Sequence, residues 1–259
     1  MNDTFGLDIS MNEAMQFEYG DGYFGPQPEL RKLDDIRPSL MEPDCNGPQT
    51  VYSIAMDVGR DCDRKVLNER MLLFGLVGYA AGKLGREPVR SQGHIHKISS
   101  HSGWSPPEVY EIWRGKAIIY MQEFADDDPG KCYAVFAEKG DVVIVPPLWA
   151  HATISAEPDA PLLFGAWCDR EYGFEYDKVR AHKGLAWYPL LNEKNEIEWK
   201  ANLNYNQTEL IIKQPRDYYD DFGIEKGVPL YTQFINEPER FQFVSKPAIL
   251  VEKWKGFIP

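Results

Sequence analysis

The sequence has few cysteines and no long apolar run. Its 259 residues include four cysteines that lie far apart and form no CxxC pair, namely Cys45, Cys62, Cys132 and Cys168. We interpret them as reduced thiols rather than as a disulfide framework. No apolar stretch approaches the roughly 20 residues of a membrane-spanning helix, and the first residues lack the basic and apolar segments of a signal peptide. We therefore expect a cytoplasmic protein that has no membrane partner.

Positive charge is also scarce. The chain carries 28 Lys and Arg residues against 40 Asp and Glu residues, which gives a net charge of −12. Nucleic acids and anionic membranes attract basic surfaces, so neither is expected as the main partner. A phosphorylated small molecule is not excluded, because a few local hydrogen-bond donors are enough to bind it.

Helical periodicity is missing as well, and short apolar runs separated by turn residues take its place. The predicted strands are 51–58, 71–80, 89–96, 108–113, 116–124, 132–137, 142–145, 151–155 and 161–167. Many short strands at this spacing indicate an all-β sandwich or barrel, and the jelly roll is one member of that class.

The all-β domain is placed at residues 49–177. Residues 1–48 are interpreted as an N-terminal extension that wraps the core. Residues 178–259 are interpreted as a C-terminal extension that packs on the roll or on a second subunit. Within it, residues 218–222 are expected to form a short helix, and residues 229–234 and 248–254 are expected to be extended or strand-like.

Three histidines and one glutamate recur at spacings that suit a metal site. His94 and His96 are two residues apart, so on a strand both side chains point to the same face. Glu108 opens the next strand, and further on Gly140 is followed by five residues, Pro146, four more residues and then His151. Neutral imidazoles and a carboxylate suit a divalent first-row metal, so we expect one metal ion, with Fe2+, Mn2+, Ni2+ and Zn2+ all left open.

The segments SQGHIHKISS…PPEVYEIWRGKAIIYMQ and KGDVVIVPPLWAHATIS resemble the two motifs of the cupin superfamily. Within it, they are most similar to the cupin-type glucose-6-phosphate isomerase family. This resemblance implies a cupin double-stranded β-helix (jelly roll) with terminal extensions and few short helices. It further implies a homodimer with a sugar-phosphate substrate.

The resemblance also implies roles for individual residues. The metal ligands would be His94, His96, Glu108 and His151, and the catalytic residues would be Glu108 and Tyr110. Tyr110 shares a strand face with Glu108 and would face the bound sugar. The expected substrate contacts are Ser91, Gly93, Lys97 and Tyr176.

The sequence departs from the family pattern in three places. Residues 97–107 make the gap between His96 and Glu108 longer than in the family. Phe174 stands where the family has a histidine that contacts substrate, and Ser91 replaces a threonine but keeps the hydroxyl. These departures bear on the substrate more than on the metal.

The expected activity is the isomerisation of glucose 6-phosphate to fructose 6-phosphate. A metal that holds two adjacent sugar oxygens could stabilise a cis-enediolate, and a hydride shift is the competing route. Three alternatives stay open. The first is an isomerase that acts on a different sugar or sugar phosphate. The second is a cupin that binds metal and sugar without catalysis, and the third is an iron oxygenase.

Overall fold

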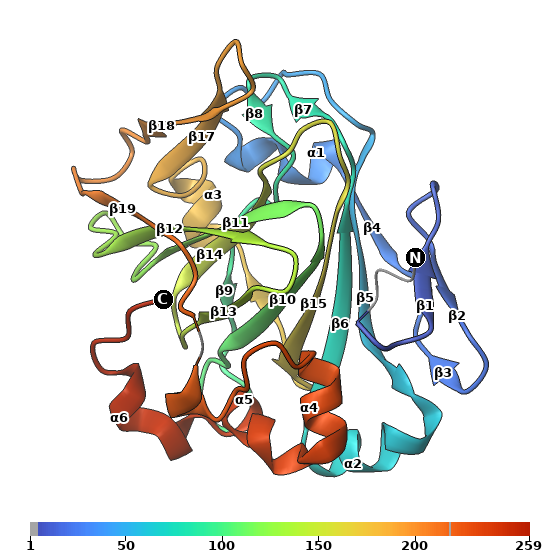
Figure 1. Cartoon of the computed structure of the whole chain (residues 1–259). Coiled ribbons are helices and arrows are strands. Elements are labelled where there is room, and N and C mark those ends of the chain that lie inside the picture. The colour runs from blue at the N-terminus through green and yellow to red at the C-terminus, as the bar shows by residue number, and fades with distance from the viewer. Residues whose placement is uncertain (1–4, 218) are drawn as a thin grey trace.

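Two β-sheets face each other in the computed structural model, which describes residues 5–217 and 219–259 (Figure 1). The larger sheet has the strand order β13-β10-β15-β6-β5-β3, with β4 beside β5, and the smaller sheet has the order β14-β11-β12-β19. Neighbouring strands are antiparallel, except that β19 runs parallel to β12. The all-β jelly roll predicted from the sequence is confirmed.

The strands of the larger sheet are β3 (Tyr23–Phe24), β4 (Glu29–Lys32), β5 (Thr50–Arg60), β6 (Leu72–Tyr79), β10 (Glu108–Arg114), β13 (Val142–Val145) and β15 (Leu162–Asp169). Those of the smaller sheet are β11 (Lys116–Gln122), β12 (Cys132–Glu138), β14 (Ala150–Ser155) and β19 (Leu210–Lys213). Four two-stranded pairs complete the β-structure: β1 (Ile9–Met11) with β2 (Phe17–Tyr19), β7 (Lys83–Leu84) with β8 (Glu87–Pro88), β9 (Ile95–His96) with β16 (Phe174–Glu175), and β17 (Trp187–Leu191) with β18 (Ile197–Ala201).

The helices are short. They are α1 (Leu33–Ile36), α2 (Arg64–Glu69), α3 (Asp177–Ala181), α4 (Leu230–Asn236), α5 (Gln242–Ser245) and α6 (Val251–Trp254). Single 3-10 turns occur at Arg37–Ser39, Asp61–Asp63, Asp220–Phe222, Pro238–Phe241 and Pro247–Leu250. Among the described residues, no helix has the length and apolarity needed to cross a membrane.

Both faces of each sheet are covered, which explains why the strands read as nearly continuous apolar runs. On β10, Tyr110 and Ile112 point into the space between the two sheets, whereas Val109 and Trp113 belong to a cluster on the opposite face. A strand with period two places alternate side chains in two different cores. The core between the sheets surrounds the place where the candidate site lies.

The terminal segments cover the outer faces of the roll. Trp167 of β15 packs against Tyr231 and Phe234 of α4 and against Phe241, with ring centroids 5.6, 4.7 and 5.1 Å apart. In Figure 1 the orange and red helices α4 and α5 lie below the large sheet. The outer face of the small sheet packs against Val179 and the residues that follow it. The C-terminal segment therefore buries apolar area on this chain's own roll, while the boundaries at residues 48/49 and 177/178 stay a prediction.

Three expectations about local structure were wrong. Residues 229–234 and 248–254 are helical rather than extended, because their apolar residues dock as short turns on the large sheet and on one another. Residues 89–96 are not one strand: only Ile95–His96 is regular, and single bridges at Arg90 and His94 join the preceding segment to β14. Gly93 breaks the strand there with φ of +89°. The short helix expected at 218–222 is present as a 3-10 helix at Asp220–Phe222, and residue 218 lies outside the described residues.

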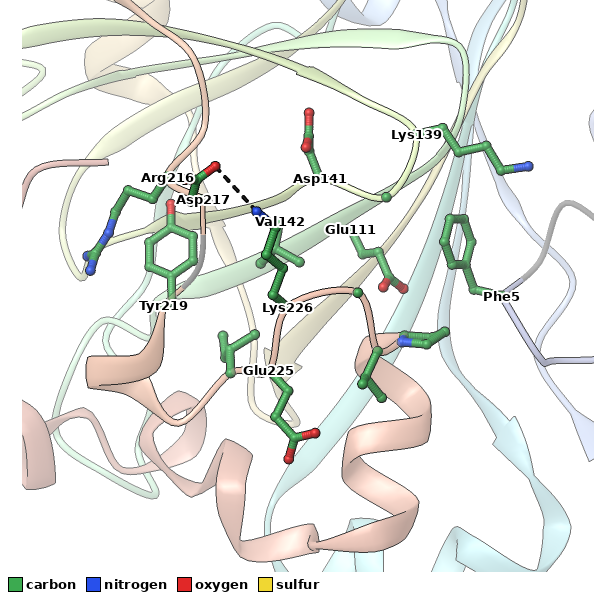
Figure 2. Close-up of a pocket in the computed structure, with 15 residues that line it drawn as sticks. Phe5, Glu111, Lys139, Asp141, Val142, Arg216, Asp217, Tyr219, Glu225 and Lys226 are labelled. Atoms are coloured by element: carbon green, nitrogen blue, oxygen red, sulfur yellow. Dashed lines mark hydrogen bonds and ion pairs between the residues drawn. The ribbon is translucent and has the colours of Figure 1, made fainter.

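Glu111 is a buried carboxyl on the outer face of β10. It accepts hydrogen bonds from the backbone N–H of Leu230 at 3.0 Å and from Nε1 of Trp113 at 2.9 Å, so it fastens the start of α4 to the sheet. It borders a cavity of about 310 Å³ under the C-terminal segment (Figure 2). Burial raises the pKa of Glu111 to about 7, although both hydrogen bonds act in the opposite direction.

Glu111 should make the protein less stable as the pH rises. Its pKa is about 7 when folded and near the ordinary 4.5 when unfolded. The folded state therefore holds the proton more tightly between these values, and the stabilisation present below pH 4.5 is lost as the pH rises through 7. We expect a loss of about 2–3 kcal/mol in the free energy of unfolding over this range, absent in Glu111→Gln. Urea unfolding from pH 5 to 8 measures it, with the exposed Glu138→Gln as control. Equal slopes in wild type and Glu111→Gln would contradict the assignment.

Candidate metal centre

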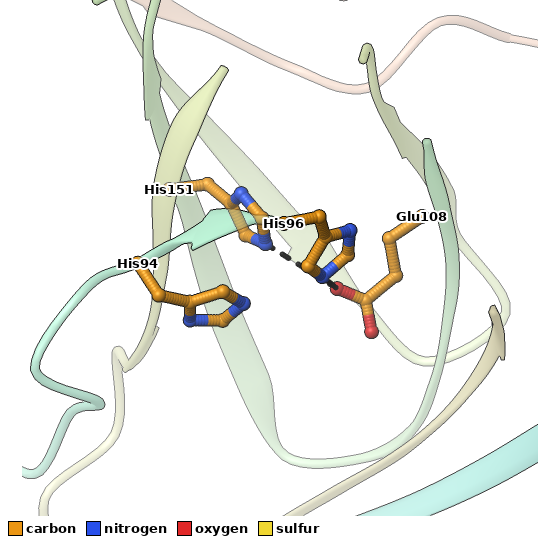
Figure 3. Close-up of side chains that lie close together, drawn as sticks. All are labelled: His94, His96, Glu108 and His151. Carbon is orange, nitrogen blue, oxygen red and sulfur yellow. Dashed lines mark hydrogen bonds and ion pairs between the residues drawn. The ribbon is translucent and has the colours of Figure 1, made fainter. Parts of the chain in front are cut away.

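Four side chains from three segments of the chain converge between the sheets. His96 lies on β9, Glu108 is the first residue of β10, His151 lies on β14, and His94 is bridged to His151 through the backbone. One potential ligand atom from each residue lies within 4.8 Å of all the others (Figure 3). Nε2 of His151 and Nε2 of His96 lie 3.3 and 3.4 Å from the same oxygen of Glu108. The four residues that the sequence predicts as metal ligands therefore lie close together in the structure.

Backbone carbonyls orient two of the imidazoles. Nδ1 of His96 lies 3.0 Å from the carbonyl oxygen of Pro106, and Nδ1 of His151 lies 3.0 Å from that of Trp149. A carbonyl oxygen can only accept, so each Nδ1 carries a hydrogen, and each Nε2, which faces Glu108, is the nitrogen that would bind a metal once it carries no proton. A partner on the outer ring nitrogen that fixes the tautomer is the usual arrangement around metal-binding histidines.

Burial and charge set the ionisation of the cluster. Burial lowers the pKa of His94 well below its ordinary value, and the neighbouring His151 and His96 act in the same direction. Burial alone would raise the pKa of Glu108, but its hydrogen bonds with His151 and His96 outweigh that effect, and the pKa lies well below its usual range. Glu108 raises the pKa of His96 despite the burial of that imidazole. A neutral His94 and an ionised Glu108 are the protonation states that metal binding requires, and His96 would have to give up its Nε2 proton to bind.

The donor set fits a divalent metal ion. Nε2 of His94 is buried and has no hydrogen-bond partner among residues 5–217 and 219–259. Buried polar atoms in native proteins nearly always have a partner. An unpaired imidazole nitrogen that faces two other imidazoles therefore indicates a bound partner such as a metal ion. Three nitrogens and one carboxylate oxygen are ligands that divalent first-row transition metals accept, and they leave coordination positions open for substrate. The cluster could hold such an ion, whose identity the residues do not determine.

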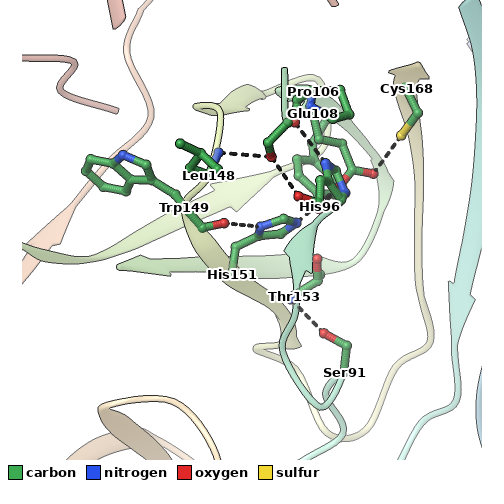
Figure 4. Close-up of polar contacts among 11 residues, drawn as sticks. Ser91, His96, Pro106, Glu108, Leu148, Trp149, His151, Thr153 and Cys168 are labelled. Carbon is green, nitrogen blue, oxygen red and sulfur yellow. Dashed lines mark hydrogen bonds and ion pairs between the residues drawn. The ribbon is translucent and has the colours of Figure 1, made fainter. Parts of the chain in front are cut away.

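Two further donors hold the carboxylate of Glu108. The hydroxyl of Tyr110 donates to Oε2 at 2.6 Å. The thiol of Cys168 donates to Oε1 at 3.3 Å (Figure 4). Both carboxylate oxygens are thus engaged by neighbouring strands β10 and β15. The buried charge is stabilised by hydrogen bonds, and its orientation is fixed before any ligand arrives.

The loop at residues 97–107 is packed against the site rather than extended into solvent. Ser105 donates to the carbonyl of His96 at 2.8 Å and accepts the N–H of Leu148 at 3.1 Å (Figure 4). Glu171 accepts the N–H of His101 at 2.7 Å and the hydroxyl of Ser100. The longer gap between His96 and Glu108 therefore forms a structured wall beside the cluster.

The cavity next to the cluster is lined by hydroxyls and apolar side chains. Its lining residues are Tyr52, Ile54, Met56, Val77, Tyr79, Ser91, His94, Glu108, Tyr110, Thr153, Phe164, Phe174 and Tyr176. Its volume is about 50 Å³, far below the ~300 Å³ or more of typical ligand pockets. The ring of Phe174 lies 4.5 Å from that of His94 and closes the cavity from one side. A sugar-sized ligand therefore requires side chains such as Phe174 to move.

Only some of the residues predicted to contact substrate line the cavity. Tyr110, Ser91 and Tyr176 line the cavity, and the hydroxyl of Ser91 accepts the N–H of Thr153 at 3.1 Å. Gly93 and Lys97 do not line it. Gly93 serves a tight backbone turn, where an added Cβ would lie 2.8 Å from Leu185. Lys97 has an exposed side chain, and its backbone N–H bonds to Gly173.

Sequence reasoning missed three polar residues at the site. Cys168 contacts Glu108, and Tyr79 and Thr153 line the cavity. Two of them could have been found from the alternation of side chains along their strands. Thr153 is two residues after His151 on β14, and Cys168 shares the inward face of β15 with Phe164.

The fold and the site together define a class of protein. A jelly roll that holds three histidines and a glutamate between its sheets, on β9, β10, β14 and the residues just before β9, is a cupin-type barrel. Residues 38–208 match the model of the family described as glucose-6-phosphate isomerase (GPI). The match spans more than half of the chain, which therefore belongs to this family.

Curated relatives include proteins named glucose-6-phosphate isomerase from three archaea. That of Thermococcus onnurineus is 30% identical over 126 residues, which cover 46% of this chain and 60% of the relative. That of Thermococcus litoralis is 32% identical over 105 residues, covering 40% and 50%. That of Pyrococcus horikoshii is 31% identical over 117 residues, covering 45% and 56%. The chain thus spans about half the length of the relatives that it matches.

Solved structures offer only distant likenesses. An oxalate oxidase aligns with a TM-score of 0.36 and 14% identity, covering 48% of this chain and 53% of its own. A vicilin from hazelnut aligns with a TM-score of 0.36 and 10% identity, covering 50% and 33%. At these scores neither likeness supports an inference about the site.

Removal of one imidazole should abolish tight metal binding. We expect His94→Ala to lower the affinity for a divalent transition metal by at least about 100-fold. Loss of a residue that only hydrogen-bonds to a metal ligand already lowers metal affinity by about 10–100-fold. Equilibrium dialysis with elemental analysis measures this affinity. His182→Ala is the matched control, because His182 is paired with Asp127 outside the cluster. Unchanged metal stoichiometry and affinity in His94→Ala would contradict the proposed ligand set.

Proposed function

We propose that this protein is a metal-dependent aldose–ketose isomerase that interconverts glucose 6-phosphate and fructose 6-phosphate. The observation that carries the proposal is the convergence of His94, His96, Glu108 and His151 beside a hydroxyl-lined cavity. The family match at residues 38–208 supports the reaction class. The relatives' name supports the substrate pair.

The reaction moves one hydrogen between C1 and C2 of an open-chain sugar. A divalent metal, when bound by these four residues, supplies Lewis-acid polarisation of the sugar's carbonyl and adjacent hydroxyl. The residues themselves fix the substrate: Tyr110, Ser91 and Thr153 present hydroxyl groups on the walls of the cavity. Apolar side chains such as Phe164 keep water away from the reacting carbons.

Glu108 is the proposed proton carrier. It is the only carboxylate that lines the cavity within the described part of the chain, and it is only 8% exposed. In a proton-transfer route, the Glu108 carboxylate takes the proton from one carbon and returns it to the neighbouring carbon through a cis-enediolate, while the proton of the adjacent hydroxyl passes to the former carbonyl oxygen. Tyr110 and Cys168 hold the carboxylate in place during both transfers. A hydride shift would instead use Glu108 only as a ligand and orienting group.

A homodimer and a cytoplasmic location belong to the same proposal. They rest on the resemblance to cupin isomerases and on the four free cysteines, Cys45, Cys62, Cys132 and Cys168. Sedimentation equilibrium would test the dimer.

A coupled assay of fructose 6-phosphate conversion tests the reaction. Protein stripped with chelator and reloaded with Fe2+, Mn2+, Ni2+ or Zn2+ should regain activity with at least one metal. Glu108→Gln should lose at least about 100-fold in kcat, because general base catalysis contributes ~10²–10⁴-fold. The same assay in D₂O shows label in the product for proton transfer and none for a hydride shift. No turnover with any metal, in protein that binds metal stoichiometrically, would contradict the substrate assignment.

Phe174 favours a second candidate, an isomerase for another sugar or sugar phosphate. Its ring fills the side of the cavity next to His94 and His96, with centroids 4.5 and 5.8 Å away. We expect Phe174→Ala to widen the range of sugars and sugar phosphates that raise the thermal midpoint of unfolding. Phe124→Ala, at a residue 54% exposed, is the control. If wild type and Phe174→Ala respond to the same ligands, Phe174 does not select the substrate.

A further inference from the structure

Strand β19 ends the smaller sheet and has a strand on one side only. Within the described part of the chain it pairs with β12, in parallel, and the sheet stops there (Figure 1). The outer edge of such a strand presents backbone N–H and C=O groups that have no partner in the sheet. An edge of this kind can take up a further strand from another chain unless charges, prolines or a covering segment prevent it.

The middle of β19 is apolar and exposed. Ile211 is 37% exposed and Ile212 is 56% exposed. Ile211 lies beside Tyr133 of β12, which belongs to the core between the sheets, and Ile212 lies beside Ala134, which belongs to the cluster on the outer face. Both apolar layers therefore end at this edge with an isoleucine that is only partly covered. A further strand would extend both layers.

This strand lies outside the part of the chain that matches the isomerase family. The family match ends at residue 208, and β19 spans Leu210–Lys213. The edge is thus a feature of the C-terminal segment, and its role does not follow from the family match.

The sequence ELIIK at residues 209–213 complements itself in the antiparallel direction. When two copies are aligned about a two-fold axis at Ile211, this residue faces its own counterpart, and Leu210 faces Ile212. Glu209 of each copy faces Lys213 of the other. Apolar pairs and pairs of opposite charge stabilise an antiparallel ladder when they lie directly across from each other. The strand therefore carries the pattern that suits a second copy of itself.

The two charges select this register. A shift by one residue would set Glu209 opposite Ile212, or Lys213 opposite Leu210, and neither shift pairs the two charges. A parallel alignment in register would place like charges side by side, which is unfavourable. Only the alignment centred on Ile211 gives both opposite-charge pairs.

Neither charge is neutralised within the chain. Glu209 and Lys213 have no ion-pair partner among residues 5–217 and 219–259. Burial lowers the pKa of the Lys213 ammonium, and the positive charge of Arg216 acts in the same direction. A carboxylate from a second copy would supply the opposite charge that Lys213 lacks.

We propose that β19 is the contact surface for a second copy of this chain, joined by an antiparallel β19–β19 pair with Ile211 on the two-fold axis. The smaller sheets of the two copies would then form one continuous sheet. Because both copies use the same edge, the assembly closes after two and does not propagate. The inference rests on the homodimer of the proposed function and names its interface, and it does not depend on the reaction.

A hollow beside the start of β19 would be covered by the same pairing. Its volume is about 340 Å³, and its lining includes Trp187, Leu203, Tyr205 and Thr208. Leu203 is 91% exposed. In the antiparallel pair, the residues after Lys213 of one copy run past Thr208 of the other and towards this hollow. A strand of four residues covers less than the roughly 800 Å² per partner of a stable interface, so the hollow supplies further apolar area.

A charge swap on the full-length protein tests the register. Sedimentation equilibrium measures the dissociation constant of the wild-type dimer. Glu209→Lys and Lys213→Glu should each weaken the dimer by about 10-fold or more, because each change turns two attractive cross-strand pairs into two repulsive ones. The double variant with Glu209→Lys and Lys213→Glu should regain most of the wild-type affinity, since its charges are complementary again.

Ile211→Lys tests the position of the two-fold axis. It places two ammonium groups directly opposite each other, so we expect a monomer at concentrations at which wild type is a dimer. Ile249→Lys is the matched control, because Ile249 is an isoleucine, 58% exposed, that lies outside β19. Thermal midpoints check that each variant is folded. If one variant unfolds, the remaining ones decide, since Glu209 and Ile211 are both exposed in the monomer.

A monomeric wild type overturns the β19 interface. So does a dimer whose dissociation constant is unchanged in folded Glu209→Lys and Ile211→Lys, or a double variant that stays as weak as the single ones. An unchanged dimer would leave the homodimer standing on another face of the molecule. The isomerase proposal fails or stands separately, because the assay of fructose 6-phosphate conversion measures it without reference to β19.

Discussion

The burial of one carboxylate, that of Glu108, is the constraint on which the site depends. A charged group inside a protein is costly unless hydrogen bonds or opposite charge compensate for the lost water. Here the hydroxyl of Tyr110, the thiol of Cys168 and the imidazoles of His96 and His151 surround it. These groups come from β10, β15, β9 and β14. The carboxylate thus links both sheets, and the jelly roll must close correctly before the cluster exists.

Coverage of both outer faces makes this arrangement possible. The stacking of Trp167 on Tyr231 and Phe241 seals the large sheet on the side away from the cluster. Without that cover, the outward residues of β10 and β15 would face water, and the strands that carry Glu108 and Cys168 would lose half of their packing. The C-terminal segment therefore supports the site at a distance, through the rigidity of the strands.

Sequence patterns predicted those parts of the molecule that local rules determine. The strands of the roll were readable because both faces are buried, and His94, His96, Glu108 and His151 lie together as their spacing predicted, although His94 precedes β9 rather than lying on it. The C-terminal helices were not readable, because elements of four to seven residues show too few turns for a helical period to emerge. The break in the predicted strand at 89–96 was also missed, because a pattern of apolar residues does not reveal the positive φ of Gly93.

Arg31 shows why the surroundings of a site are harder to predict than its metal ligands. No motif surrounds it, and it lies opposite Tyr52, a residue of the cavity lining, only because β4 pairs with β5. The chain as a whole carries a net charge of −12, so its long-range field repels a phosphorylated sugar. The phosphorylated substrate proposed for this protein would then depend on short-range hydrogen-bond donors inside a cleft of low dielectric, where near groups outweigh many distant carboxylates.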